Sequence, residues 1–224
     1  MEKINTVVVG YGGMGKYHAD NIAKFENFNL VGIYDIKEER CELARENNVK
    51  AYESFEAVLA DDKVELIVCA TYNDCHKDIA IRAMRAGKNV ISEKPVTLCS
   101  EDLEEMIAVA NETGKLFTVH QNRRWDNDYR TIKNILDKNE LGPVFSMESK
   151  VYGSRGVPTG WRAEKEHGGG MLLDWGVHLI DQIVYLIDRP VVDVRAYLRS
   201  ETVSQVDDRS IIEFTFDNGV HARV

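Results

Sequence analysis

A short apolar stretch followed by closely spaced glycines, near the start of the sequence, constrains the fold more than any other feature. Residues 7–9 are consecutive valines, a pattern typical of a strand buried on both faces. Gly10, Gly12 and Gly15 follow in the spacing G-x-G-x-x-G, and residues 16–24 are expected to form a helix. In such a unit the glycines allow a tight turn, the close approach of a pyrophosphate and tight helix packing, and the helix start offers N–H groups to phosphates. The sequence therefore predicts a dinucleotide site lined by Gly10, Gly12, Gly13, Met14 and Gly15.

An acidic residue follows the next predicted strand. The apolar run 28–34 ends at Asp35, twenty residues after Gly15, where a dinucleotide-binding fold places an acid that binds the ribose hydroxyls. No arginine follows immediately, and a carboxylate repels a ribose 2′-phosphate, so NAD is expected rather than NADP. The alternative is that Asp35 caps a helix over residues 37–47. The two roles are compatible.

The remainder of the first half alternates strands with helices. Apolar runs at 66–70, 90–91 and 116–119 are separated by segments with helical character, and this alternation predicts a parallel, doubly wound sheet. Because ligands bind at the carboxyl ends of such strands, the residues just after them are candidates for the site. These are Thr71, Tyr72 and Asn73 after the first of these runs, and Glu93-Lys94-Pro95 after the second.

The pattern changes near residue 121. Residues 144–152, 191–198, 210–216 and 220–224 alternate apolar and polar side chains, as in a sheet with one covered face. An Asp-Asn-Gly turn at 217–219 predicts a hairpin between the last two strands. We therefore expect an N-terminal α/β domain over residues 1–120. An α+β domain with an open, mainly antiparallel sheet, incomplete in this chain, is expected over residues 121–224.

Lys94 is the first candidate for a catalytic role. It follows a predicted parallel strand, and Pro95 biases it toward an extended backbone. A lysine held there can direct its ammonium group at the nicotinamide side of a cofactor site. Taken alone, a lysine in a turn is more often a surface residue, but the Glu-Lys-Pro context favours the functional interpretation.

Asp174 and His178 form the second candidate constellation. Four residues apart on a predicted helix over 171–187, they share one face, with Asp181 near the same stripe. A histidine can exchange a proton with a hydroxyl near neutral pH, and a carboxylate can orient it. The alternatives are a metal pair, disfavoured because only one histidine is present, and a surface salt bridge, disfavoured by the helix-weakening Gly176. No metal is expected.

Composition limits the remaining classes of function. The formal net charge of −9 disfavours binding to nucleic acid and to anionic membrane surfaces. No signal-peptide pattern and no apolar run long enough to span a bilayer are expected, which points to the cytoplasm. The four cysteines form no C-x-x-C pair, so neither a zinc site nor a disulfide is expected.

Taken together and in this order, these motifs resemble the glucose–fructose oxidoreductase/inositol dehydrogenase (Gfo/Idh/MocA) family over essentially the whole chain. The residues that carry the resemblance are the glycine turn, Asp35, Ala70-Thr71-Tyr72-Asn73 with His76, Glu93-Lys94-Pro95, Trp161-Arg162, and Gly168-Gly169-Gly170 followed by Asp174 and His178. The glycine motif alone is weak, whereas the combination at these separations is specific.

The resemblance implies an N-terminal Rossmann domain and an NAD-dependent dehydrogenase acting on a sugar, cyclitol or related secondary alcohol. It implies that His178 is the acid/base on the substrate oxygen, that Lys94 positions that oxygen and that Asp174 orients the group. A homo-oligomer formed through the C-terminal sheet is also implied. Beyond the glycine turn and Asp35, the residues that it places at the cofactor are Thr71, Asn73, His76, Glu93, Lys94, Gln121, Trp161 and Arg162, with Arg123 near the pocket.

Two departures from the family pattern stand out. Tyr72 occupies a position at which proline is common, which alters the expected adenine-side wall. The chain stops at Val224 on an alternating strand, so we expect a fragment or a shortened member with an unfinished sheet edge at residues 220–224.

Two other functions are compatible with parts of the sequence. A methyltransferase also has a glycine loop and an acid after its second strand, but has no use for Lys94 or for Asp174 with His178. A noncatalytic, NAD-responsive regulatory protein of the same fold is disfavoured by these residues and favoured by the early stop.

Overall fold

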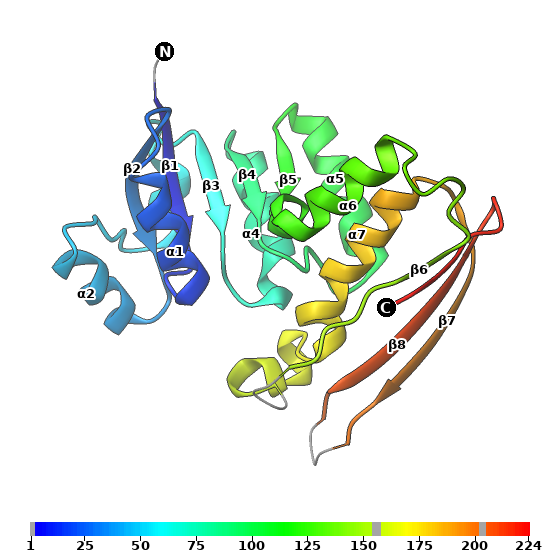
Figure 1. Ribbon diagram of the computed structural model, residues 1–224. Coiled ribbons are helices and arrows are strands. Elements are labelled where there is room, and N and C mark those ends of the chain that lie inside the picture. The colour runs from blue at the N-terminus through cyan, green and yellow to red at the C-terminus, as the bar shows by residue number, and fades with distance from the viewer. Residues whose placement is uncertain (1–2, 154–157, 202–204) are drawn as a thin grey trace. The chain divides into compact units, whose positions relative to one another are not determined.

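Parallel pairing of short apolar strands builds the first unit of the chain. The computed structural model describes residues 3–153, 158–201 and 205–224, which divide into two compact units, Met1–His120 and Gln121–Val224 (Figure 1). In the first unit the strand order is β2-β1-β3-β4-β5, with every neighbouring pair parallel. These strands are β1 (Ile4–Val9), β2 (Phe28–Tyr34), β3 (Leu66–Cys69), β4 (Asn89–Ser92) and β5 (Phe117–Val119).

Helices cover both faces of this sheet because successive residues of its central strand point in opposite directions. Val7 and Val9 of β1 pack into one apolar cluster together with side chains of α3, α4 and α5, whereas Val8 packs into a second cluster with side chains of α1 and α2. This is the predicted doubly wound Rossmann arrangement, which is confirmed. The helices are α1 (Gly13–Ile22), α2 (Glu38–Glu46), α3 (Phe55–Ala60), the 3-10 turn η1 (Asn73–Cys75), α4 (His76–Arg85) and α5 (Ser100–Thr113).

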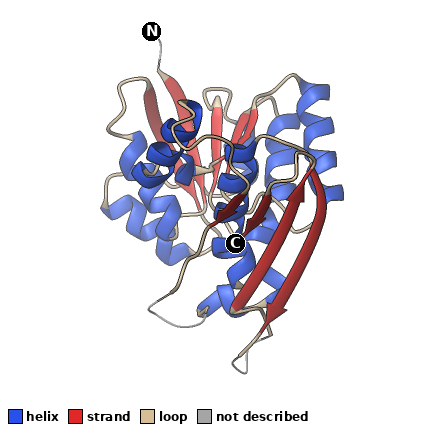
Figure 2. Cartoon of the chain, turned by 45° about the vertical axis from the view of Figure 1, so that its right-hand side comes forward, coloured by secondary structure: helices blue, strands red, loops and turns tan. Residues whose placement is uncertain are grey.

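The second unit contains a mixed, mainly antiparallel sheet in the order β6-β9-β8-β7. Its strands, red in Figure 2, are β6 (Ser146–Glu148), β7 (Val191–Arg199), β8 (Arg209–Phe216) and β9 (His221–Arg223). β8 pairs antiparallel with β7 and β9, and β6 pairs parallel with β9. The predicted hairpin is confirmed, with Gly219 at a φ of +83°. The helical segments are η2 (Asn122–Trp125), α6 (Asn127–Asp137), η3 (Gly160–Ala163), η4 (Lys165–His167), the π-helix η5 (Leu172–Gly176) and α7 (Val177–Ile187).

Two expectations for this unit need correction. Residues 220–224 do not form a sheet edge, because β9 lies between β8 and β6; the edges of the described sheet are β6 and β7. The pairing with β6 joins residues about seventy-five positions apart and leaves no local signal. The helix predicted over 171–187 begins as the π-helix η5 and becomes α-helical only at Val177.

The apolar side of α7 packs against β8. Ile183 is buried against the aromatic residues Phe214 and Phe216, and the buried residues of β8 alternate along the strand. Within the described chain, the stretch Lys165–Ile187 is long and apolar enough, by length and composition alone, to cross a membrane. The expectation of no such run is therefore wrong by that measure. Core helices of soluble proteins meet the same criterion; the buried residues of α7 are His178 and Ile183.

The contact between α1 and β1 yields a first prediction. A Cβ added at Gly15 would lie 1.8 Å from the carbonyl oxygen of Gly10, so the Gly15→Ala variant must push the helix off the turn. We expect it to lower the free energy of unfolding by about 1–3 kcal/mol or more. Gly13→Ala is the matched control, because a Cβ there meets nothing within 4 Å. Urea unfolding of both variants measures the difference, and equal stabilities would contradict the contact.

Candidate functional site

The carboxyl ends of all the strands in the first sheet carry candidate side chains. Gly10 follows β1, Asp35 follows β2, and Glu93 with Lys94 follows β4. The carboxyl ends of parallel strands all lie at the same end of the sheet. These residues therefore lie together at that carboxyl end, where ligands bind in this kind of fold. Thr71 and the buried Asn73 follow β3 at that end, and His120 follows β5.

The glycine turn has the geometry of a phosphate cradle. Gly10 has a φ of +89°, and a Cβ there would lie 2.5 Å from the carbonyl oxygen of Ala70. Its N–H donates to the Tyr34 oxygen at 2.7 Å, which ties the turn to β2. Gly12 precedes α1 and makes no side-chain cap, so the first N–H groups of the helix, from Gly13 onward, are left for a ligand. The residues of the turn therefore fit a dinucleotide pyrophosphate.

Asp35 is buried and already accepts hydrogen bonds. The Tyr11 N–H donates to its Oδ2 at 2.6 Å, and the Lys37 N–H donates to its Oδ1 at 2.9 Å. The Arg40 guanidinium donates to Oδ2 at 3.1 Å. Asp35 therefore supports the start of α2 without being its cap residue, which is Lys37. Arg40 has no local signal in the sequence, because it lies five residues after Asp35 and its contact depends on the direction of a long side chain.

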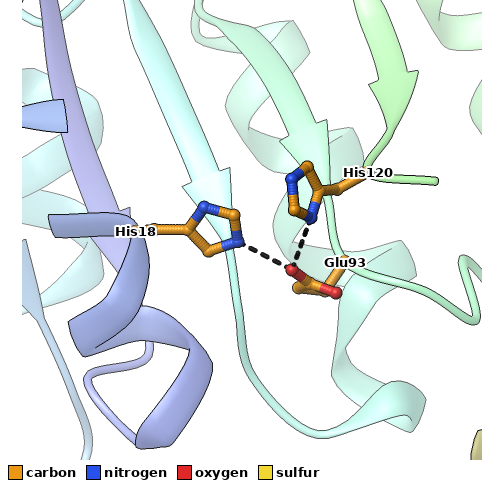
Figure 3. A group of neighbouring side chains, drawn as sticks. All are labelled: His18, Glu93 and His120. Carbon is orange, nitrogen blue, oxygen red and sulfur yellow. Dashed lines mark hydrogen bonds and ion pairs between the residues drawn. The ribbon is translucent and has the colours of Figure 1, made fainter. Parts of the chain in front are cut away.

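Glu93 joins three elements of the first unit, as Figure 3 shows. Its Oε1 lies 2.7 Å from Nε2 of His18, on α1, and 3.0 Å from Nδ1 of His120, after β5. Its Oε2 accepts the backbone N–H of Lys94 at 3.2 Å. Burial raises the pKa of Glu93, but the hydrogen bonds from His120 and His18 outweigh burial and hold that pKa well below its ordinary value. The carboxylate is thus ionised and both imidazoles donate to it.

The same three side chains have the composition of a metal site but the spacing of a hydrogen-bonded group. Two histidines and one carboxylate lie close enough to hold an ion. Ligands that surround zinc at about 2.0–2.2 Å are separated from one another by about 3.3 Å in a tetrahedron. The His18–Glu93 and His120–Glu93 distances of 2.7 and 3.0 Å are those of direct hydrogen bonds. We interpret the group as a brace around Lys94.

His76 also braces this turn. It is fully buried, and its Nδ1 donates to the Pro95 carbonyl oxygen at 2.9 Å. Burial lowers the pKa of His76, against the opposing effect of the bond to Pro95, so the ring is neutral. The Lys94–Pro95 peptide bond, on the other side of the proline from that carbonyl group, is cis. The hydrogen bond to Pro95 holds His76 against the turn that carries Lys94. Contact of His76 with the cofactor stays a prediction.

In the second unit, Trp161, Arg162 and Asp174 are brought together. The Arg162 guanidinium lies 4.5 Å from the Trp161 ring centroid, and its Nε lies 3.2 Å from Oδ1 of Asp174. Gly169 allows this because a Cβ there would lie 2.3 Å from the Arg162 carbonyl oxygen. Two of the sequence motifs, Trp-Arg and Gly-Gly-Gly, thus form one structure.

The π-helix changes the relation between Asp174 and His178. Its wider i→i+5 turn departs from the α-helical geometry on which the shared face was predicted. His178 is buried and lies edge-on to Trp175, whose ring is covered by the Arg123 guanidinium at 4.3 Å. π-bulges are frequent at functional sites. The orienting role of Asp174 toward His178 stays a prediction.

Asp181 is paired with an arginine of the same unit. Arg124 grips it with two hydrogen bonds, from Nε at 2.8 Å and from Nη2 at 2.5 Å. Asp181, which was expected near the stripe of Asp174 and His178, thus links α7 to η2.

The predicted site residues are divided between the two units. Lys94 belongs to the first unit, whereas Asp174 and His178 belong to the second. Gln121, predicted to meet the cofactor, begins the second unit; its Oε1 is buried and has no hydrogen-bond partner among the residues that the structure describes. Convergence of Lys94 with His178 stays a prediction.

The depressed pKa of Glu93 gives a prediction for acid stability. Because this pKa is lower in the folded chain than in the unfolded chain, the carboxylate stabilises the fold above the unfolded pKa of about 4.3 and loses that effect as pH falls toward the folded pKa. Glu93→Gln should lower the free energy of unfolding by about 1.5–3 kcal/mol at pH 7. The difference from the native chain should shrink below about pH 4.

Urea unfolding at pH 7 and pH 3.5 measures this effect. Glu104→Gln, at an exposed position of α5, is the control and should change stability little at either pH. A Glu93→Gln penalty that is the same at both pH values would contradict the assignment of the depressed pKa.

Comparison with known proteins identifies the family. A model described as "Oxidoreductase family, NAD-binding Rossmann fold" matches residues 4–121, and a model of the GFO/IDH/MocA C-terminal domain matches residues 129–224. A solved NAD-binding protein from Listeria innocua superposes with a TM-score of 0.96 at 48% identity, over 99% of this chain and 66% of that one. GenD2 from gentamicin A biosynthesis, solved in complex with NAD, superposes with a TM-score of 0.90 at 25% identity, over 100% of this chain and 65% of that one.

A curated relative adds an activity to the comparison. The scyllo-inositol 2-dehydrogenase (NADP(+)) IolW of Bacillus subtilis (strain 168) is 29% identical over 212 residues, which cover 92% of this chain and 59% of that protein. The chain thus spans about two thirds or less of the length of these relatives. Family models match most of both units, and the protein belongs to the Gfo/Idh/MocA family of NAD-binding oxidoreductases.

Proposed function

We propose that the protein is an NAD-dependent dehydrogenase that transfers a hydride between the nicotinamide and a CH–OH carbon of a sugar, cyclitol or related secondary alcohol. The observation that carries the proposal is that the glycine turn, the buried Asp35 and the braced Lys94 all lie at the carboxyl ends of strands of one parallel sheet. The Bacillus relative is named for an inositol substrate and NADP, and GenD2 was solved with NAD.

The first unit would bind the cofactor through groups already in place. The glycine turn and the N–H groups that begin α1 would hold the pyrophosphate. Asp35, fixed by the N–H groups of Tyr11 and Lys37, would accept hydrogen bonds from the ribose hydroxyls. Hydride transfer is the chemistry that the nicotinamide supplies when bound.

The remaining chemistry is the movement of a proton at the substrate oxygen. In our proposal the His178 imidazole takes this proton when the alcohol is oxidised and returns it in the reverse direction. The Lys94 ammonium hydrogen-bonds to the same oxygen and stabilises negative charge on it. Asp174 orients the acid/base group. Loss of Lys94 should therefore raise the KM for substrate as well as lower kcat.

We also propose that the C-terminal sheet associates with a second copy of the chain, in the cytoplasm. Every residue of the edge strand β7 is exposed. Among them Val192, Val194 and Tyr197 have more than half of their surface accessible, and such an apolar strand edge favours association.

Two measurements test the proposed function. Calorimetric titration with NAD and NADP tests nucleotide binding, and a panel of polyols and sugars with absorbance at the reduced-nicotinamide band tests turnover. Binding without turnover on any member of the panel would favour a regulatory protein, and binding of S-adenosylmethionine in place of the nicotinamide cofactors would favour a methyltransferase.

The acid/base role of His178 gives a sharper prediction. His178→Ala should lower kcat by about a hundredfold or more, the usual scale for the loss of a general acid/base. The dissociation constant for NAD should change less than about threefold, because the pyrophosphate and ribose contacts proposed for NAD lie in the first unit. His221→Ala, at an exposed position of β9, is the control and should retain full turnover. Near-normal turnover of the His178→Ala variant at all pH values would contradict the acid/base role of His178.

A further inference from the structure

We propose that Trp175, held in place by the Arg123 guanidinium, orients the imidazole of His178, in addition to the role proposed for Asp174. Trp175 is a positioning residue in this inference: it acts through His178 and not on the substrate. The inference rests on the proposed function, because the orientation of His178 matters in that reaction. All of its evidence lies within the second unit.

The contact between the two rings is the first evidence. The ring centroids of Trp175 and His178 are 6.1 Å apart and the ring planes meet at 71°, an edge-to-face arrangement in the range that aromatic pairs prefer. His178 is buried. The outer torsion of a histidine side chain has only broad preferences of its own. The orientation of this imidazole therefore depends on what packs against it, and Trp175 is a large, flat neighbour.

Arg123 fixes the tryptophan in turn. Its guanidinium lies 4.3 Å from the centroid of the Trp175 ring, in cation–π geometry. Two hydrogen bonds hold the arginine: its Nη1 donates to Oδ2 of Asp126 at 2.9 Å, and its carbonyl oxygen accepts the side-chain amide of Gln182 at 2.9 Å. Gln182 belongs to α7, as His178 does. The arginine is therefore tied to the helix of the histidine through a separate contact.

The backbone between the two rings gives them a particular need for such packing. Trp175 lies in the π-helix η5, and His178 lies in the first turn of α7. In a regular α-helix the direction of a side chain follows from the helix geometry. Because the π-helix has a wider turn, side-chain directions at this junction depart from that pattern. We infer that the stack of Arg123 on Trp175 supplies the missing constraint.

The proposed chemistry depends on this orientation. A general acid/base must bring its nitrogen to about 2.6–3.2 Å from the oxygen with which it exchanges a proton. A displacement of about 1 Å can lower a rate by about a hundredfold. The indole of Trp175 has an N–H donor and no group that exchanges a proton at neutral pH. Loss of Trp175 should therefore act on kcat, through the position of His178.

The competing explanation is that the stack only packs η2 against the helix. A second pair of the same kind joins these elements: the Arg124 guanidinium lies 4.5 Å from the centroid of the Tyr185 ring. Tyr185 is half exposed and lies further along α7 than His178. If such pairs only pack η2 on the helix, Trp175→Leu and Tyr185→Leu should have the same consequences. Tyr185→Leu is therefore the matched control.

The experiment combines kinetics with NMR relaxation on the full chain. The kinetic assay uses the polyol or sugar on which the native chain is most active. Relaxation gives the order parameter of the His178 ring C–H bonds, which reports how far the ring is held in one orientation on the ps–ns timescale. The His178 signals are assigned by their absence from the His178→Ala variant.

We expect Trp175→Leu to lower kcat about tenfold or more and to change KM less than about threefold, because a transition-state geometry is lost. The order parameter of the His178 ring should fall in the same variant. Trp175→Phe keeps an aromatic ring between Arg123 and His178, so it should retain most of the native kcat and order parameter. Tyr185→Leu should change neither quantity.

A double-mutant cycle tests whether Arg123 acts through the ring. Glutamine in place of Arg123 can still bond to Asp126, but it removes the charge over Trp175. Arg123→Gln alone should lower kcat about threefold or more, and it should cause no further loss in the Trp175→Leu background. Additive losses would assign Arg123 a contact of its own and overturn its proposed role.

The outcomes that overturn the inference differ from failure of the proposed function. Native kcat and order parameter in Trp175→Leu, or equal losses in Trp175→Leu and Tyr185→Leu, would overturn it. A circular-dichroism melt shows whether each variant is folded. Should Trp175→Leu fail to fold, a native order parameter for the His178 ring in Arg123→Gln would overturn it instead. If the native chain turns over no polyol or sugar, the proposed function fails, and the order parameters still decide whether Trp175 orients His178.

Discussion

The close contact between the backbones of Gly15 and Gly10 is the constraint on which the candidate cofactor site depends. With no Cβ at Gly15, α1 packs directly against the end of β1, and no side-chain hydrogen bond caps the start of the helix. Val8 of β1 and Ala19 of α1 pack together in one buried apolar cluster. The packing of α1 on β1 therefore forms the candidate phosphate site. A side chain at position 15 would disrupt both the packing and the site.

The Glu93 carboxylate uses this placement of α1. Through His18 it reaches the same helix, through His120 it reaches the end of β5, and it accepts the Lys94 N–H. A buried charge of this kind is stable only when it is fully hydrogen-bonded. The backbone of the proposed catalytic lysine is thereby held by the helix that begins at the phosphate cradle.

The fold could be predicted from the sequence wherever the signal is local. The valines of β1, the glycine turn and the Asp-Asn-Gly hairpin each report their own structure within a few residues. Other features have no local signal. The pairing of β6 with β9 and the Glu93 group join residues that are distant in sequence, and the contact of Arg40 with Asp35 depends on the direction of a long side chain. The π-helix was missed for a different reason: its residues have the same apolar pattern as an α-helix.

The strand order separates the two tasks proposed for the first unit. Asp35 and Arg40 follow β2, which is the outermost strand on one side of the sheet. Glu93 and Lys94 follow β4. Two strands, β1 and β3, lie between them, and at about 4.8 Å per strand the two groups are roughly 14 Å apart. In the proposed function, Asp35 therefore contacts the cofactor at a place separate from the brace around Lys94, and the glycine turn after β1 lies between the two groups.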